Sequence, residues 1–224
     1  QISARNPLKL SSVYDKIEEA SGKKFQDAFM EVCDTLGKIW KAEADSRAPY
    51  IPREQVTPEP KLYTDYSSVI FAGDGMYAVK NGFVHTPTLV RISPDGRERF
   101  LAYMSPQSSE LRADAEGGLW WSENRNDERW SLETGSAVRR RKGMKTRRIG
   151  NNSLRYNPAP SPVGSVFSVS EYRITGETGL NILDDSGCIL QTFDVPDSLQ
   201  IVQTAWMTEK DIYASAISEN GYGI

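Results

Sequence analysis

The sequence predicts a mostly β protein with a small helical segment at its N-terminal side, and three observations lead to this prediction. Apolar residues recur in steps of three and four within residues 1–48, which is the spacing of amphipathic helices. A stretch at 49–62 holds four prolines and cannot form a helix or a central strand. From residue 63 onward, short apolar runs alternate with Gly, Asp, Asn and Ser, which is typical of antiparallel strands. We therefore expect a helical hairpin (1–48), a linker (49–62) and a β region (63–224).

Composition bounds the class of protein. The chain has 224 residues, 38% of them hydrophobic and 25% charged, so it should bury a core. Its net charge of −3 argues against a general nucleic-acid partner. No apolar run reaches the ~18 residues that span a bilayer. His85 is the one histidine, so no metal site with two histidines exists within this chain, and we expect no cofactor.

The helical segment has recognisable ends. Ser11 or Ser12 can cap a first helix, and Ser21-Gly22 ends it. The second helix carries an apolar stripe of Phe25, Ala28, Phe29, Val32, Leu36, Ile39 and Trp40. Such stripes usually belong to a core, so we expect this one to pack on a neighbour, with a partner-binding helix as the alternative.

The β region repeats itself about every 45 residues. Four runs carry an aromatic residue at the same place, GDGMYAVK, EGGLWWSE, VGSVFSVS and EKDIYASA. Their aromatic residues are 43, 47 and 46 residues apart: Tyr77, Trp120, Phe167 and Tyr213. A second set of turns agrees, because Gly96, Gly143 and Gly187 are 47 and 44 residues apart.

About four short strands in each ~45-residue repeat indicate β-propeller blades. A β-sandwich is the alternative, but it would not repeat so regularly. The region 63–224 holds three repeats and part of a fourth, so we predict a partial propeller of four-stranded antiparallel blades. We expect the chain to be a fragment of a larger ring. We also expect it to self-associate through an open blade edge.

One motif in these repeats resembles a known family. The segment RISPDG (Arg91 to Gly96) and the later AWMTEKDIYASA look like the degenerate blade pattern of TolB-like β-propellers. The third repeat keeps Ser161-Pro162 and Gly164 of that pattern, and the fourth keeps Trp206 but loses Ser-Pro-Asp-Gly. The resemblance covers residues 63–224 and implies a bacterial periplasmic or cell-surface location.

The helical segment adds a second resemblance. The stretch ASGKKFQDAFMEVCDTLGKIWKAEA is similar to the helical segment that follows gluzincin-type metallopeptidase domains in some bacterial surface or secreted proteins. The matching residues are Gly22, Phe25, Ala28, Phe29, Leu36 and Trp40. The His-Glu-x-x-His motif of such peptidases does not occur in this chain, so the resemblance assigns no catalytic residue here.

The segment WWSENRNDERW (Trp120 to Trp130) is the best candidate for a binding surface. Aromatic and Arg side chains can stack on sugars or peptides, so we name Trp121, Arg125, Arg129 and Trp130 as ligand-binding or partner-binding residues. The favoured interpretation nevertheless places Trp120 and Trp121 in the core, because neighbours on a strand point to opposite faces and both faces of a blade are buried. Trp130, with Arg125 and Arg129, is then the better candidate for a surface.

Other features favour structural roles. The run RRRKGMKTRR (Arg139 to Arg148) has seven basic residues in ten and is expected to be a solvated hairpin rather than an anion-binding site. The acid pair Asp184-Asp185 is predicted to lie in a turn rather than to form a catalytic pair. Cys33 and Cys188 are expected to be buried free thiols.

No catalytic constellation is visible, so the sequence predicts that the protein is not an enzyme. It predicts a non-catalytic binding or scaffolding propeller that recognises a peptide, glycan or protein partner. The alternative is the accessory propeller region of a secreted metallopeptidase whose catalytic domain lies outside this chain.

Overall fold

The structure is a computed structural model that describes residues 13–47, 49, 51–52, 54–73, 75–126, 134–163, 166–173 and 175–223. The chain divides into two compact units, Gln1–Glu54 and Gln55–Ile224. Residues 55–62 of the predicted linker therefore belong to the β unit. Neither described helix is long and apolar enough to cross a membrane.

The first unit holds two helices, α1 (Val13–Ser21) and α2 (Phe25–Ser46). They meet through Tyr14 and Phe25, whose ring centroids are 4.6 Å apart. Gly22 has a φ of +67°, and its amide donates to the Glu18 carbonyl, which ends α1. Neither helix buries a residue, and within this unit the apolar stripe of α2 is exposed except at Phe25 and Ala28, which are half-buried.

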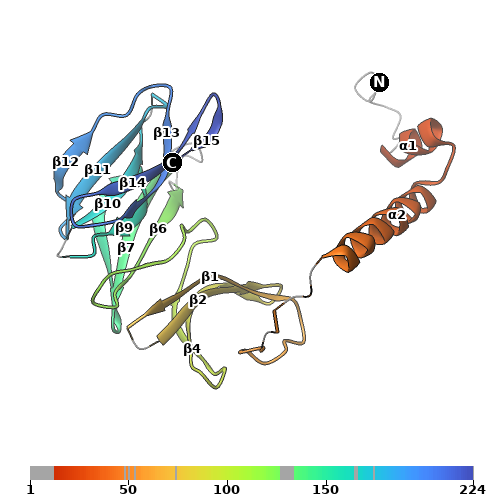
Figure 1. Cartoon of the computed structure of the whole chain (residues 1–224), viewed down its shortest axis with the longest axis horizontal. Helices are drawn as coiled ribbons and strands as arrows, with labels where there is room; N and C mark the ends of the chain where they lie inside the picture. The colour runs from red at the N-terminus through yellow and green to blue at the C-terminus, as the bar shows by residue number, and fades with distance from the viewer. Residues whose placement is uncertain are drawn as a thin grey trace. The chain divides into compact units, whose positions relative to one another are not determined.

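The second unit consists of four antiparallel sheets (Figure 1). The first sheet contains β1 (Thr64–Ala72), β2 (Gly75–Gly82), β3 (His85–Ile92) and β4 (Glu98–Tyr103). The second contains β5 (Arg112–Ala113), β6 (Leu119–Asn126), β7 (Thr134–Lys142) and β8 (Lys145–Ser153). The third contains β9 (Arg155–Pro160), β10 (Val166–Tyr172), β11 (Thr178–Asp184) and β12 (Ile189–Phe193). The fourth contains β13 (Gln200–Trp206), β14 (Ile212–Ser218) and β15 (Gly221–Gly223).

Each sheet is a meander, because hydrogen-bonded neighbours follow one another in the sequence. The first strands of successive sheets contact each other, β1 with β5, β5 with β9, and β9 with β13. This arrangement confirms the predicted fold class, a mostly β partial propeller built from four-stranded blades. The glycines of the predicted turns lie where β3 meets β4, β7 meets β8 and β11 meets β12.

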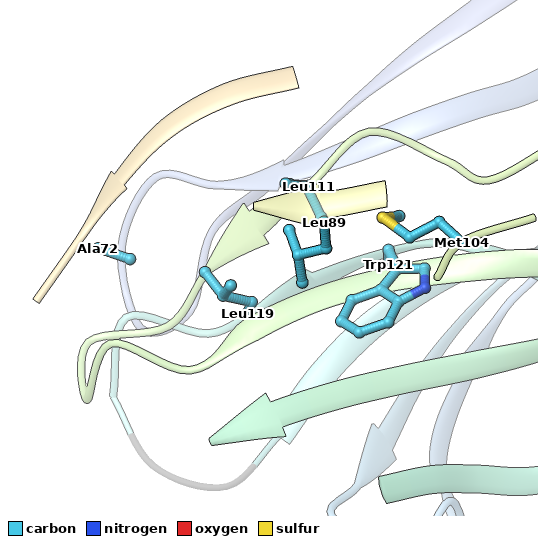
Figure 2. Packing of buried hydrophobic residues seen from close by; sticks show 6 residues of the cluster. All are labelled: Ala72, Leu89, Met104, Leu111, Leu119 and Trp121. Atoms are coloured by element: carbon cyan, nitrogen blue, oxygen red, sulfur yellow. The ribbon is translucent and has the colours of Figure 1, made fainter. Parts of the chain in front are cut away.

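Two hydrophobic clusters join the first three sheets. The first fills the space between the first and second sheets (Figure 2), and its buried members are Ala72, Leu89, Met104, Leu111, Leu119 and Trp121. The second lies between the second and third sheets and contains Trp120, Val138, Ile149, Phe167, Val169 and Leu183. Trp120 and Trp121 therefore serve different cores, as strand alternation requires.

The first strands share an irregularity. In the first sheet Ser67 pairs with Val79 but Ile70 pairs with Tyr77, so β1 holds one residue more than its partner. The same one-residue β-bulge occurs in β9 before Ala159 and in β13 after Ile201. In the second sheet the extra residue lies between the Ser108–Glu123 bridge and the start of β5.

Candidate ligand-binding site

A polar cavity of about 490 Å³ lies beside the irregularities of the second and third sheets, and we call it the first-strand cavity. It is built where β4 leads into β5, where β8 leads into β9, and where β6 and β10 end. Its lining consists of Gln107, Ser108, Ser109, Ser122, Asn124, Leu154, Tyr156, Asn157 and Tyr172. The connections between sheets and the second strands β6 and β10 thus supply a mostly polar lining.

The bulge in β9 fixes the position of Asn157. Its φ is +52°, in the left-handed region that asparagine tolerates better than most residues. Its backbone amide donates to Ser122 Oγ at 3.1 Å, which ties the third sheet to the second. Its side-chain Nδ2 donates to the Val202 carbonyl at 2.6 Å, which ties the third sheet to the fourth. Asn157 is therefore held from both sides and presents a fixed amide oxygen.

The opposite wall is held by bonds between β6 and the segment before β5. The Ser109 amide donates to the Ser122 carbonyl, and the Ser122 amide donates to Ser109 Oγ, both at 2.8 Å. Asn124 Nδ2 donates to Gln107 Oε1 at 3.0 Å. These bonds hold Gln107 and Ser109 in place, although the segment before β5 forms no regular strand.

Several polar atoms of the cavity remain available to a ligand. Within the described residues, no hydrogen bond uses Asn157 Oδ1, Asn124 Oδ1, Gln107 Nε2 or the Tyr156 hydroxyl. These atoms are two hydrogen-bond acceptors, one amide donor and one hydroxyl that can donate or accept. Such a mixture suits a ligand that is both donor and acceptor.

Among the described residues that line the cavity, none carries an ionised side chain. The rings of Tyr156 and Tyr172 meet edge to face with centroids 5.4 Å apart, and the Tyr172 hydroxyl donates to the Ile201 carbonyl. Burial raises the pKa of both tyrosines, so both are neutral at physiological pH. The site therefore offers hydrogen bonds and ring surface without a charge to attract an ion.

The four predicted binding residues do not form one surface. Trp121 is 1% exposed, lies in the core between the first and second sheets, and donates from Nε1 to Glu123 Oε1. Its ring face is therefore not available to a ligand, since cross-sheet packing covers it. Arg125 is exposed and follows Asn124 of the cavity, whereas Arg129 and Trp130 lie outside the described residues.

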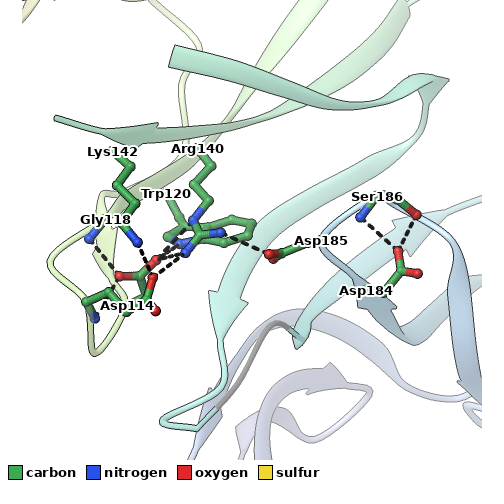
Figure 3. Close-up of polar contacts among 9 residues, drawn as sticks. Asp114, Gly118, Trp120, Arg140, Lys142, Asp184, Asp185 and Ser186 are labelled. Atoms are coloured by element: carbon green, nitrogen blue, oxygen red, sulfur yellow. Dashed lines mark hydrogen bonds and ion pairs between the residues drawn. The ribbon is translucent and has the colours of Figure 1, made fainter. Parts of the chain in front are cut away.

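Within the basic run, four of the side chains bind other residues of the chain. Arg139 pairs with Glu123 at 3.0 Å, Lys142 pairs with Glu116, and Arg141 donates to Thr146 Oγ1. Arg140 donates to Asp114 Oδ2 at 2.8 Å and to Asp185 Oδ2 at 3.1 Å, and lies over the Trp120 ring (Figure 3). Arg140 thus joins the second sheet to the turn that follows β11.

Asp114 is the centre of this network. It also accepts hydrogen bonds from Trp120 Nε1 and the Gly118 amide (Figure 3). Burial alone would raise the pKa of Asp114, but the bonds from Trp120, Gly118 and Arg140 outweigh burial and lower it. Asp114 is therefore a structural anion of the second sheet.

The acid pair Asp184-Asp185 also has structural partners. Asp184 Oδ1 accepts bonds from the Ser186 amide and hydroxyl and from the Cys188 amide, which close the turn before β12. Asp185 instead pairs with Arg140. The two cysteines are free, but the expectation that they are buried is wrong, since both are exposed.

Sequence reasoning missed the first-strand cavity. Its polar residues lie in the strand connections and at the bulges, which were not singled out. The one signal available was the run SPQSSE, which is polar without being charged at its centre and precedes the second repeat. Among the described residues, no group of three or more His, Cys, Asp or Glu is placed to hold a metal ion.

No family model and no curated protein matches the chain. A solved structure of a puromycin-hydrolysing peptidase from Mycobacterium tuberculosis is similar, with a TM-score of 0.52 and 15% identity. The similarity covers 75% of this chain but only 30% of the peptidase chain. A gluconolactonase from Xanthomonas campestris matches with a TM-score of 0.43 and 14% identity, over 66% of this chain and 56% of that one.

These comparisons correct one prediction. The sequence predicted that the protein is not an enzyme, but the peptidase whose structure is similar to it is an enzyme. That prediction is contradicted and is not retained. At 15% identity the peptidase shows the fold alone, and this chain spans about a third of its length.

Proposed function

We propose that this chain is the ligand-recognising propeller region of a hydrolase and that its first-strand cavity binds a neutral glycan. The observation that carries the proposal is the uncharged lining of amides, serine hydroxyls and two tyrosines. Sugar hydroxyls both donate and accept hydrogen bonds, which matches the available atoms of Asn124, Gln107, Asn157 and Tyr156. Tyrosine rings add apolar surface for the sugar ring.

The size and charge of the cavity favour a glycan over the other two ligand classes. Its volume of about 490 Å³ is in the range of small-ligand sites, whereas a protein partner needs a far larger surface. A charged peptide would find no counter-ion among the described residues that line the cavity. A neutral disaccharide fits both constraints.

The test is calorimetric titration of the whole chain with cellobiose, diacetylchitobiose and the tripeptide Ala-Gly-Ala, acetylated and amidated at its ends so that it is uncharged. Tyr156→Phe removes one hydroxyl and keeps the ring, so we expect about fivefold weaker saccharide binding, as for one lost neutral hydrogen bond. Asn81→Asp, in the first sheet and outside the cavity, should bind like the natural chain. Saccharide binding that is absent at millimolar concentration, or equal in both variants, would overturn the proposal.

Binding of Ala-Gly-Ala without either saccharide would instead assign the cavity to peptides. That result would favour the second candidate, the propeller region of a secreted metallopeptidase. The candidate is supported by the resemblance of the helical segment and by the peptidase in which this fold occurs. It is tested by reading the coding sequence upstream of Gln1 for a His-Glu-x-x-His motif, whose absence removes it.

The resemblance to TolB-like propellers also leads us to propose a periplasmic or cell-surface location. Cys33 and Cys188 are exposed free thiols and provide a direct probe. A membrane-impermeant maleimide should label the protein on cells whose outer envelope alone has been opened. Labelling only after complete lysis would contradict this location.

A further inference from the structure

A second and larger hollow lies between the third and fourth sheets, and we call it the sheet groove. Its volume is about 900 Å³. Residues of β11 and β12 line one side, and β13, β14 and the turn between them line the other. It shares no lining residue with the first-strand cavity.

Polar contacts join these two sheets beside the groove. Ser168 and Thr204 are both buried, and their hydroxyl oxygens are 2.8 Å apart. Trp206 Nε1 donates to the Ala159 carbonyl at 3.0 Å, which fixes the indole as one wall. The sheets are therefore held together at a fixed spacing beside an unfilled space, so the groove is formed in advance of any ligand.

Large apolar side chains are exposed in this groove. Phe193, Tyr213 and Met207 are 38%, 53% and 70% exposed and all line it. Large apolar residues gathered in one groove typically mark an interaction site. Aromatic residues and methionine are also the types enriched at interfaces.

The charge of the groove is negative. Asp194, Glu209 and Asp211 line it together with Lys210, the one cation among the described residues of the lining. Asp211 accepts a hydrogen bond from Thr208, whereas Asp194 and Glu209 have no ion-pair partner among the described residues. Two carboxylates beside an apolar surface are complementary to a partner that combines apolar and basic side chains.

We propose that the sheet groove binds an extended peptide segment of a partner protein, with apolar side chains on the aromatic wall and Lys or Arg beside Asp194 and Glu209. A groove bounded on both sides by strands suits an extended chain, whose alternate side chains point to opposite sides. This interaction goes beyond glycan recognition, because it uses other residues and a negatively charged surface in place of an uncharged one. The groove is a docking surface, and the cavity is a ligand site.

The probe is a fluorescein-labelled Leu-Lys-Leu-Lys-Leu-Lys peptide, with Leu-Glu-Leu-Glu-Leu-Glu for comparison, measured by fluorescence polarisation on the whole chain. We expect the Lys peptide to bind at least tenfold more tightly than the Glu peptide. Tyr213→Ala should weaken binding about tenfold and Glu209→Gln about threefold. The matched controls Tyr103→Ala, in the first sheet, and Glu219→Gln, outside the groove, should leave it unchanged.

Tyr213 and Glu209 are exposed, so both variants should fold, and their near-ultraviolet circular dichroism should match that of the natural chain. Equal loss of binding in Tyr213→Ala and Tyr103→Ala would overturn the proposal. Equal affinity for the Lys and Glu peptides would overturn it as well. A dimer in sedimentation that dissociates only in Tyr213→Ala would show that a second copy occupies the groove, which also overturns it.

Discussion

The two faces of the third sheet differ although the same strands form both. The face toward the second sheet presents Phe167, Val169 and Leu183 to a closed apolar core. The face toward the fourth sheet presents Ser168 and Ser170, both fully buried, beside an open groove. Alternation along β10 alone decides which residue faces which sheet. One face of a propeller blade can therefore be purely structural while the other face borders an open groove, where we propose binding.

The largest expected effect is on the apolar core between the second and third sheets. Phe167→Ala removes a fully buried ring that lies 4.8 Å from the ring of Trp120, so we expect a loss of about 3–5 kcal/mol in the free energy of unfolding. Phe193→Ala, in the groove, should cost about 1 kcal/mol or less because the ring is already partly in water. Urea unfolding measures both free energies. Similar losses for the two variants would contradict the difference in packing between the two faces.

The next effect tests the ion network beside the closed face. Asp114→Asn removes the charge that Arg140 contacts, so we expect a loss of about 1–3 kcal/mol. Asp194→Asn is the matched control in the groove, where no ion pair is lost among the described residues, and its effect should stay within about 0.5 kcal/mol. A large effect of the control would mean that the groove is as tightly held as the core.

The pH dependence of stability follows from the same carboxylate. The pKa of Asp114 is lower in the folded chain than in the unfolded chain, so its contribution is present above the unfolded value, about 3.9, and is lost as pH falls toward the folded value. Between pH 6 and pH 3 the natural chain should lose more stability than Asp114→Asn. Parallel urea midpoints for the two proteins across this range would contradict the prediction.

A smaller effect tests the polar face. Ser168→Ala leaves the buried Thr204 hydroxyl without its partner, so we expect a loss of about 1–2 kcal/mol. Combining it with Thr204→Val should restore part of that loss, because both polar groups are then gone. Additive losses in this double-mutant cycle would show that the two hydroxyls do not interact.

The smallest effect concerns the groove wall. Met207 is 70% exposed, so Met207→Ala should change the free energy of unfolding by less than about 0.5 kcal/mol. The corresponding change in the first core, Met104→Ala, removes a side chain that is 4% exposed and should cost at least 2 kcal/mol. Thermal unfolding followed by circular dichroism gives both values, and equal shifts in Tm would contradict the comparison.

The repeat of about 45 residues predicted the sheets correctly, because its period can be recognised from short stretches of sequence. Tyr77, Trp120, Phe167 and Tyr213 all lie on the second strand of their sheets, as their spacing indicated. Their environments could not be predicted in the same way, since Phe167 is fully buried and Tyr213 is 53% exposed. Burial depends on which sheet lies opposite, and that information is not local.

The candidate site was harder to predict than the fold for a physical reason. Trp121 and Arg125 were predicted to bind a ligand because aromatic and Arg side chains are typical of binding surfaces, yet Trp121 belongs to the core. The cavity is instead made by Asn157, Ser122 and Gln107, which meet only through a bulge and the contacts between first strands. A bulge is a feature of strand register, and a single strand read alone does not reveal it.

The bulges have a consequence for how these blades can change over time. In β9, Tyr156 and Ala159 are three residues apart, yet both pair with residues on the same face of β10. The inserted residue reverses the inside–outside alternation halfway along the strand. Substitutions on the cavity side of the bulge are thereby uncoupled from those on the core side. Each blade can therefore acquire new specificity at one end of its first strand while the hydrophobic pattern at the other end is inherited unchanged.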